Sequence, residues 1–95
     1  MRGEVHLNRV LCKIPPFAVK ALYRQIAVVE QEQFQVRIFE GRVVQTNPQV
    51  IAERSNAEVH LHPTLKQALE DAESEFKESI ASEKWEPYNP ALPQF

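Results

Sequence analysis

The chain is poor in the residues that build cofactor loops and cysteine sites: its 95 residues include one cysteine and two glycines. With Cys12 alone, no disulfide and no cysteine-based zinc site can form within the chain, and Cys12 in its apolar run is expected to pack as a small buried hydrophobe. Gly3 and Gly41 lie far apart, which excludes a glycine-rich phosphate loop. We expect no cofactor.

Long apolar runs are also missing. No stretch approaches the ~20 apolar residues that a membrane span needs, and Glu4 and Asn8 interrupt the apolar core that a signal peptide would need. Together with the single cysteine, this predicts a cytoplasmic protein without membrane contact.

Charge of one sign is not concentrated. The net charge is -2, and residues 63–95 hold three Lys/Arg against seven Asp/Glu. Nucleic-acid binders usually show a clustered basic footprint, so nucleic acid is possible as a partner but not favoured. This alternative depends on the fold gathering scattered arginines, namely Arg24, Arg37, Arg42 and Arg54.

Alternation of apolar and polar residues predicts an antiparallel sheet of about four strands. Strand-like segments cover residues 5–14, 21–29, 34–38 with 43–44, 50–52, and 57–62, although residues 17–25 also fit a helix. The polar residues 30–33 predict a hairpin. A bulge or turn is expected at residues 39–42, around Gly41, and turns at residues 46–48 and 53–56.

The same alternation assigns faces to the strands. Phe34, Val36 and Ile38 are expected to face the core. In the last strand, Ala57, Val59 and Leu61 are expected to point inward, which leaves Glu58, His60 and His62 on the surface.

One long helix is predicted from Leu65 to about Lys84. Thr64 and Gln67 have the spacing of a capping box at its start. An apolar stripe at steps of three and four would pack on the sheet, and it consists of Leu65, Ala68, Leu69, Ala72, Phe76 and Ile80. The predicted fold is therefore α+β, an antiparallel sheet with a C-terminal amphipathic helix packed on one face. Residues 1–88 form one domain, and residues 89–95 a proline-rich tail.

The histidines are weak candidates for chemistry. His60 and His62 lie two apart and so share one strand face, from which two imidazoles can reach one metal, and His6 could join them. Two histidines do not make a site, and no spacing of nucleophile, base or carboxylates indicates catalysis. A small metal-binding protein or enzyme around His60 and His62 is therefore an alternative to a non-enzymatic function.

Trp85 and Tyr88 are candidates for binding a partner, because large amphipathic aromatics anchor interfaces. The alternative is that Trp85 closes the core at the end of the helix.

Residues 22–88 resemble the WGR domain in the order of strands and helix and in an aromatic–Gly–Arg–hydrophobic signature. Gly41 and Arg42 match this signature, while Glu40 stands in the place of the signature tryptophan and Phe39 lies one position early. The resemblance implies nucleic-acid binding or interdomain contacts, with Arg42 among the contacting residues. Taken together, the sequence favours a non-enzymatic interaction module that binds a protein partner or itself.

Overall fold

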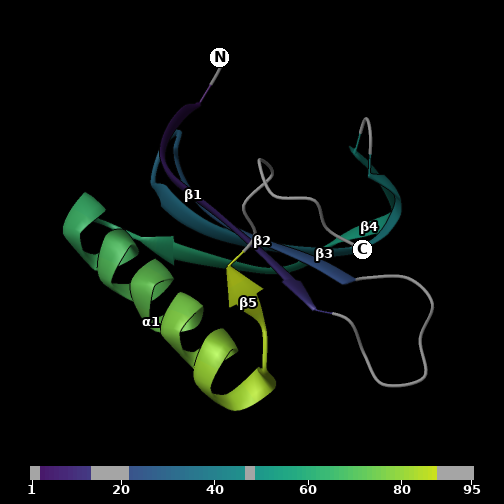
Figure 1. The fold of residues 1–95 in the computed structure, drawn as a ribbon. Helices are drawn as coiled ribbons and strands as arrows, with labels where there is room; N and C mark the ends of the chain where they lie inside the picture. The colour runs from purple at the N-terminus through teal and green to yellow at the C-terminus, as the bar shows by residue number, and fades with distance from the viewer. Residues whose placement is uncertain (1–2, 14–21, 47–48, 88–95) are drawn as a thin grey trace.

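Four long strands and one helix form where the sequence pattern predicts regular structure (Figure 1). The computed structural model describes residues 3–13, 22–46 and 49–87, and of these it describes the side chains of all but 43–46 and 49–57. The elements are β1 (Glu4–Lys13), β2 (Leu22–Glu30), β3 (Phe34–Thr46), β4 (Gln49–His62), α1 (Leu65–Glu83) and the two-residue β5 (Glu86–Pro87).

The strands form one antiparallel sheet in the order β4-β3-β2-β1-β5. Consecutive hairpins join β1 to β4, and β5 returns from the helix to pair with β1 at Leu11 and Cys12. The predicted α+β class is confirmed, with five strands where about four were expected. Residues 22–25 belong to β2, whereas residues 17–21, Tyr88 and the tail at 89–95 lie outside the described residues.

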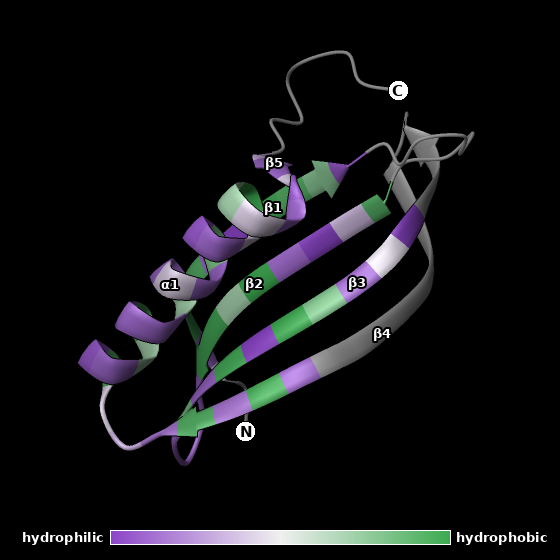
Figure 2. Ribbon diagram, turned by 90° about the horizontal axis from the view of Figure 1, so that it is seen from below, coloured by the Kyte–Doolittle hydropathy of each residue, from purple (hydrophilic) through white to green (hydrophobic). Residues whose placement is uncertain are grey.

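The helix α1 lies along one face of the sheet and is capped at both ends (Figures 1 and 2). The Gln67 amide donates to Thr64 Oγ1 at 3.2 Å, as the capping pattern predicts. At the other end Lys84 adopts the left-handed conformation with φ 65°, and the Trp85 amide donates to the Ser79 carbonyl at 3.0 Å. This reversal directs the chain back to the sheet. None of the described helices has both the length and the apolar character needed to cross a membrane.

The core lies between α1 and the central strands. Its members are Leu11, Ile26, Val28, Val36, Ile38, Ala68, Ala72 and Trp85, all buried. Phe34, Leu65, Leu69, Phe76 and Ile80 pack around them, so the predicted stripe of the helix does meet the sheet. Figure 2 shows the hydrophilic side of the helix turned outward.

β3 and β4 are longer and more continuous than predicted. β3 runs through residues 39–42 without a turn, and its pairing with β4 shifts register at Ile38/Phe39 and Glu40/Arg42. Of the bulge and the turn expected near Gly41, the structure therefore has the bulge. The turn predicted at residues 53–56 is wrong: they belong to β4, where pairing with β3 overrides the local polar composition.

The face assignment of the last strand is also wrong. Val36 pairs with His60 and Phe34 with His62, and directly opposed residues of an antiparallel pair share a face. Because Phe34 and Val36 face the helix, the histidines do too, and Val59 and Leu61 point to the open side of the sheet. The pairing of β3 with β4 shifts at Ile38/Phe39, where residue 57 has no partner. This shift sets which residues of β4 lie on the helix side from Glu58 onward.

Candidate functional site

A buried arginine joins the helix end to the sheet. Arg24, on β2, donates to Ser79 Oγ at 2.6 Å and to Glu83 Oε2 at 2.7 Å on α1, and to Glu40 Oε2 at 3.3 Å on β3. Burial alone would lower the pKa of Arg24, but its hydrogen bond to Glu83 and the charges of Glu40 and Glu83 raise it, so the guanidinium stays charged. We call the set formed by Arg24, Glu40, Ser79, Glu83, Lys13 and Trp85 the helix clamp.

Trp85 belongs to this clamp. Its side chain is 3% exposed, with Lys13 Nζ 4.7 Å and Arg24 Cζ 5.3 Å from the ring centroid. Lys13 also donates to the Glu83 carbonyl at 2.9 Å. These contacts support the alternative in which Trp85 closes the core, since a buried indole presents no docking surface. Tyr88, its companion in the predicted interface, lies outside the described residues.

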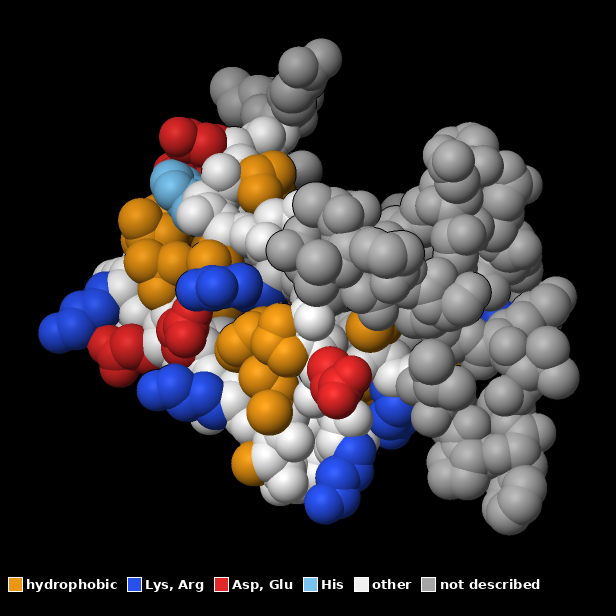
Figure 3. Space-filling model, viewed as in Figure 1, with side chains coloured by type: hydrophobic (Ala, Val, Ile, Leu, Met, Phe, Trp, Pro, Cys, Tyr) orange, Lys and Arg blue, Asp and Glu red, His pale blue; other side chains and the backbone are white. Residues whose placement is uncertain are grey.

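The candidate arginines for nucleic-acid binding do not share one face of the sheet. Arg24 is buried in the clamp, and Arg42 lies on the same sheet face, because Arg24 pairs with Glu40, two residues before Arg42. Arg37 lies on the opposite face, beside Val59 of β4. The side chain of Arg54 is outside the described set. The fold therefore divides the three arginines whose side chains are described between the two faces of the sheet, and Figure 3 shows basic and acidic side chains intermixed on the visible face.

His60 and His62 share one carboxylate on the helix. His60 Nδ1 lies 2.8 Å and His62 Nε2 2.7 Å from Asp71 Oδ2, while His60 Nε2 lies 2.7 Å from Glu58 Oε2. Both ring nitrogens of His60 thus face carboxylates, and both can donate only in the imidazolium form. Accordingly the hydrogen bond to Asp71 raises the pKa of His60 despite opposing desolvation.

The pKa of Asp71 moves in the complementary direction. Partial burial favours its neutral form, but the hydrogen bonds from His62 and His60 outweigh burial and lower the pKa. The three groups therefore form an ionic contact between β4 and α1. His60 Nδ1 and His62 Nε2 both approach Asp71 Oδ2, so this carboxylate oxygen lies where the two imidazoles converge, and metal binding by His60 and His62 stays a prediction.

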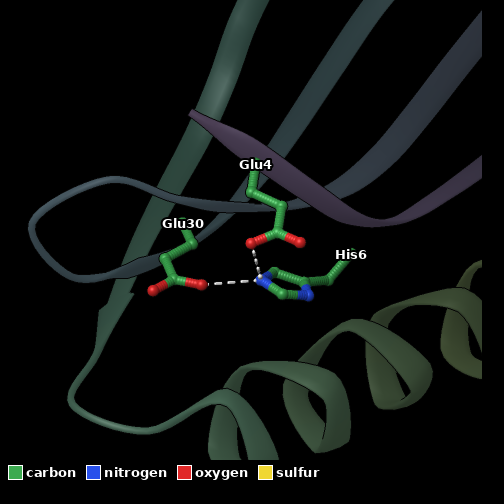
Figure 4. Close-up of side chains that lie close together, drawn as sticks. All are labelled: Glu4, His6 and Glu30. Carbon is green, nitrogen blue, oxygen red and sulfur yellow. Dashed lines mark hydrogen bonds and ion pairs between the residues drawn. The ribbon is translucent and has the colours of Figure 1, made fainter. Parts of the chain in front are cut away.

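Another histidine cluster forms where β1 begins and β2 ends (Figure 4). Glu4, His6 and Glu30 each offer one atom that could bind a metal ion. Among the described side chains these three ligand atoms all lie within 4.8 Å of one another. His6 Nε2 is 2.8 Å from Glu30 Oε1 and 3.7 Å from Glu4 Oε2. Glu4 lies two residues from His6 in the sequence, but Glu30 approaches His6 only through the pairing of β1 with β2, so the sequence alone does not predict this cluster.

The sheet face opposite the helix carries exposed apolar side chains at both edges. Val5 is 60%, Val59 42% and Leu61 58% exposed. Cys12 also points to this face but is buried; burial, followed by the charge of Glu86, raises the pKa of its thiol and keeps it protonated. Of the three exposed side chains, Val59 and Leu61 both belong to the edge strand β4 and form an apolar surface there.

No family model, curated protein or solved structure matches the chain. The resemblance to the WGR domain stays a prediction.

Proposed function

We propose that the chain is a non-enzymatic, self-associating interaction module of the cytoplasm, in which the β4 edge of one copy pairs with β4 of a second copy. The observation that carries this proposal is the exposure of Val59 and Leu61 on an alternating strand. Alternation of this kind is typical of a strand with one buried face. The helix covers the face with the histidines, and on the opposite face a strand added at the β4 edge would pack its own side chains beside the exposed Val59 and Leu61.

The position of β4 favours strand pairing. It is 14 residues long and lies at one end of the sheet order, so within the described part of the chain its outer edge has no neighbouring strand. A long edge strand presents unpaired backbone groups to a further strand. Pro63 follows the strand directly and limits the pairing to residues before it.

The sequence of β4 is complementary to itself. In an antiparallel pair with a two-fold axis at His60, Glu58 faces His62 of the second copy and Val59 faces Leu61 of the second copy. In this register Glu58, which lies 2.7 Å from His60 of its own chain, would also come beside His62 of the second copy on the helix side, and two apolar side chains would meet on the opposite side. This register covers residues 58–62 and gives a closed, isologous dimer.

The alternatives have less support. Nucleic-acid binding through the scattered arginines would require Arg24 to leave the helix clamp, and Arg37 lies on the other face of the sheet. A protein partner of another sequence could use the same edge, but the pairing of Glu58 with His62 favours a second copy.

The test is the solution mass by light scattering after size exclusion, measured from micromolar to millimolar concentration. We expect the mass to approach twice the chain mass at high concentration, and Leu61→Lys to keep the chain monomeric. The matched control is Val5→Lys, since Val5 is equally exposed on the same face but at the opposite edge. A monomer throughout the range, or a dimer that survives Leu61→Lys, would overturn the proposal.

A further inference from the structure

A bulge places three potential metal ligands on one face at the start of the sheet. Glu4 pairs with Glu30 and Val5 with Val29, after which the register shifts so that Leu7 pairs with Val28. His6 is the extra residue of this bulge. The bulge therefore lets Glu4 and His6 share a face with Leu7, whereas strict alternation would put Leu7 on the other face.

The spacing of the ligand atoms fits a small tetrahedral centre. Zinc lies about 2.0–2.2 Å from imidazole nitrogen and carboxylate oxygen, so two ligand atoms at the tetrahedral angle are roughly 3.3 Å apart. The distances from His6 Nε2 to Glu30 Oε1 and Glu4 Oε2, 2.8 and 3.7 Å, lie on either side of this value. All three ligand atoms lie within 4.8 Å of one another, so small rotations of the two carboxylates would bring them to a common centre.

The environment allows that adjustment. The His6 ring is anchored, because its side chain is 20% exposed and its centroid lies 6.1 Å from that of Phe34. The Glu4 and Glu30 side chains are 72% and 40% exposed, so both carboxylates can move. Figure 4 shows the three side chains converging between the two strands, above α1.

The ligand chemistry selects the class of ion. One imidazole and two carboxylates suit a borderline divalent transition metal and balance its charge, whereas Mg²⁺ and Ca²⁺ prefer oxygen ligands alone. Three protein ligands leave a fourth position open, which is the arrangement of a zinc site that keeps water or accepts another ligand.

We propose that Glu4, His6 and Glu30 form a zinc-binding site, in which the metal replaces the hydrogen bond between His6 and Glu30. Gly3 positions this site: a Cβ there would lie 2.9 Å from the Glu30 carbonyl oxygen and 2.8 Å from Val29 Cγ1, so only glycine allows β1 to begin so close to the end of β2. The site is independent of the β4 edge, which lies at the other side of the sheet.

The experiment is a titration of the full chain with ZnCl₂, followed by calorimetry and by thermal unfolding. We expect about one zinc per chain. At about a hundredfold excess of free zinc over its dissociation constant, a rise in melting temperature of roughly 10 °C or more is expected for a domain of this size. MgCl₂ at the same concentration should produce no such shift.

Variants assign the ligands. His6→Gln should abolish zinc binding, and Glu4→Gln should weaken it at least about tenfold while leaving the unliganded melting temperature unchanged, because Glu4 is largely exposed. His60→Ala is the control and should bind zinc as the wild type does. The proposal is overturned if the wild type binds no zinc, if Mg²⁺ produces the same shift, if binding survives His6→Gln or Glu4→Gln, or if His60→Ala abolishes it.

Discussion

The helix clamp predicts a large loss of stability when Arg24 is truncated. Arg24→Ala removes charge-assisted hydrogen bonds to Ser79 and Glu83, each worth about 1.5–3 kcal/mol, although half-exposed Glu83 can recover hydration and brings its share to the lower end. It also removes buried methylene groups at about 0.8 kcal/mol each and the contact with Trp85.

An opposing effect reduces this sum. Arg24 Nε is buried and has no hydrogen-bond partner among the described residues, and such a group costs about 1–3 kcal/mol. The expected net loss for Arg24→Ala is therefore about 3 kcal/mol. Arg24→Met keeps the buried stem and removes the unpartnered nitrogen, so its loss should be smaller, about 1 kcal/mol.

Urea unfolding followed by tryptophan fluorescence measures both values, because Trp85 is the only tryptophan and lies in the clamp. The matched control is Arg9→Ala: Arg9 also contacts a carboxylate, Glu73 at 3.1 Å, and a ring, Phe76, but is half-exposed. Its loss should stay below about 1 kcal/mol. The reasoning is refuted if Arg24→Ala is no more destabilising than Arg9→Ala, or if Arg24→Met costs as much as Arg24→Ala.

Three further substitutions test other contacts by the same unfolding measurement. Asp71 raises the pKa of His60 above its ordinary 6.5, so their contact stabilises the fold fully below pH 6.5 and is lost as the pH rises through the raised pKa. The pKa of Asp71 is lowered in turn, so the contact is lost again when the pH falls from about 3.8 through that lowered pKa. Asp71→Asn should therefore cost about 1 kcal/mol at pH 6 and less at pH 8, and an equal loss at both would contradict the assignment. Lys84→Gly should stabilise by about 0.5–1 kcal/mol, since a left-handed residue with a Cβ is strained; a loss would contradict this. Gly3→Ala should cost about 1–3 kcal/mol through its clash with the Glu30 carbonyl, whereas unchanged stability would show that β1 can shift freely.

The fold class could be predicted because its signals are local. Thr64 at a helix start, an apolar stripe ending near Ile80 and the alternation around Val36 each depend on neighbouring residues. The face of β4 could not be predicted from alternation, since the same pattern fits either orientation and the pairing with β3 decides between them. The polar residues 53–56 predict a turn by their composition, but they belong to β4 because β4 pairs with β3.

The candidate sites depend on contacts between residues far apart in the chain. Glu30 meets His6 only across the β1–β2 pair, and Asp71 meets His62 only where α1 crosses β4. The sequence shows that His60 and His62 lie two residues apart, but it does not show that Asp71 contacts both of them. A carboxylate from the helix turns that pair into an ionic contact, whereas carboxylates from two strands surround the less conspicuous His6.

The apolar face of β4 sets how strong the proposed dimer can be. Fully burying a Val or Leu side chain contributes about 1.5–3 kcal/mol. A strand paired at the edge covers only the sides of Val59 and Leu61 that face it, so this burial supplies at most roughly 2 kcal/mol per chain. Association costs at least about 4 kcal/mol in lost translational and rotational freedom. Apolar burial on two copies therefore at most balances this cost, and the net affinity must come from backbone pairing and from the contact of Glu58 with His62. A dimer of this kind forms at high concentration and dissociates on dilution, so its mass should rise smoothly with concentration.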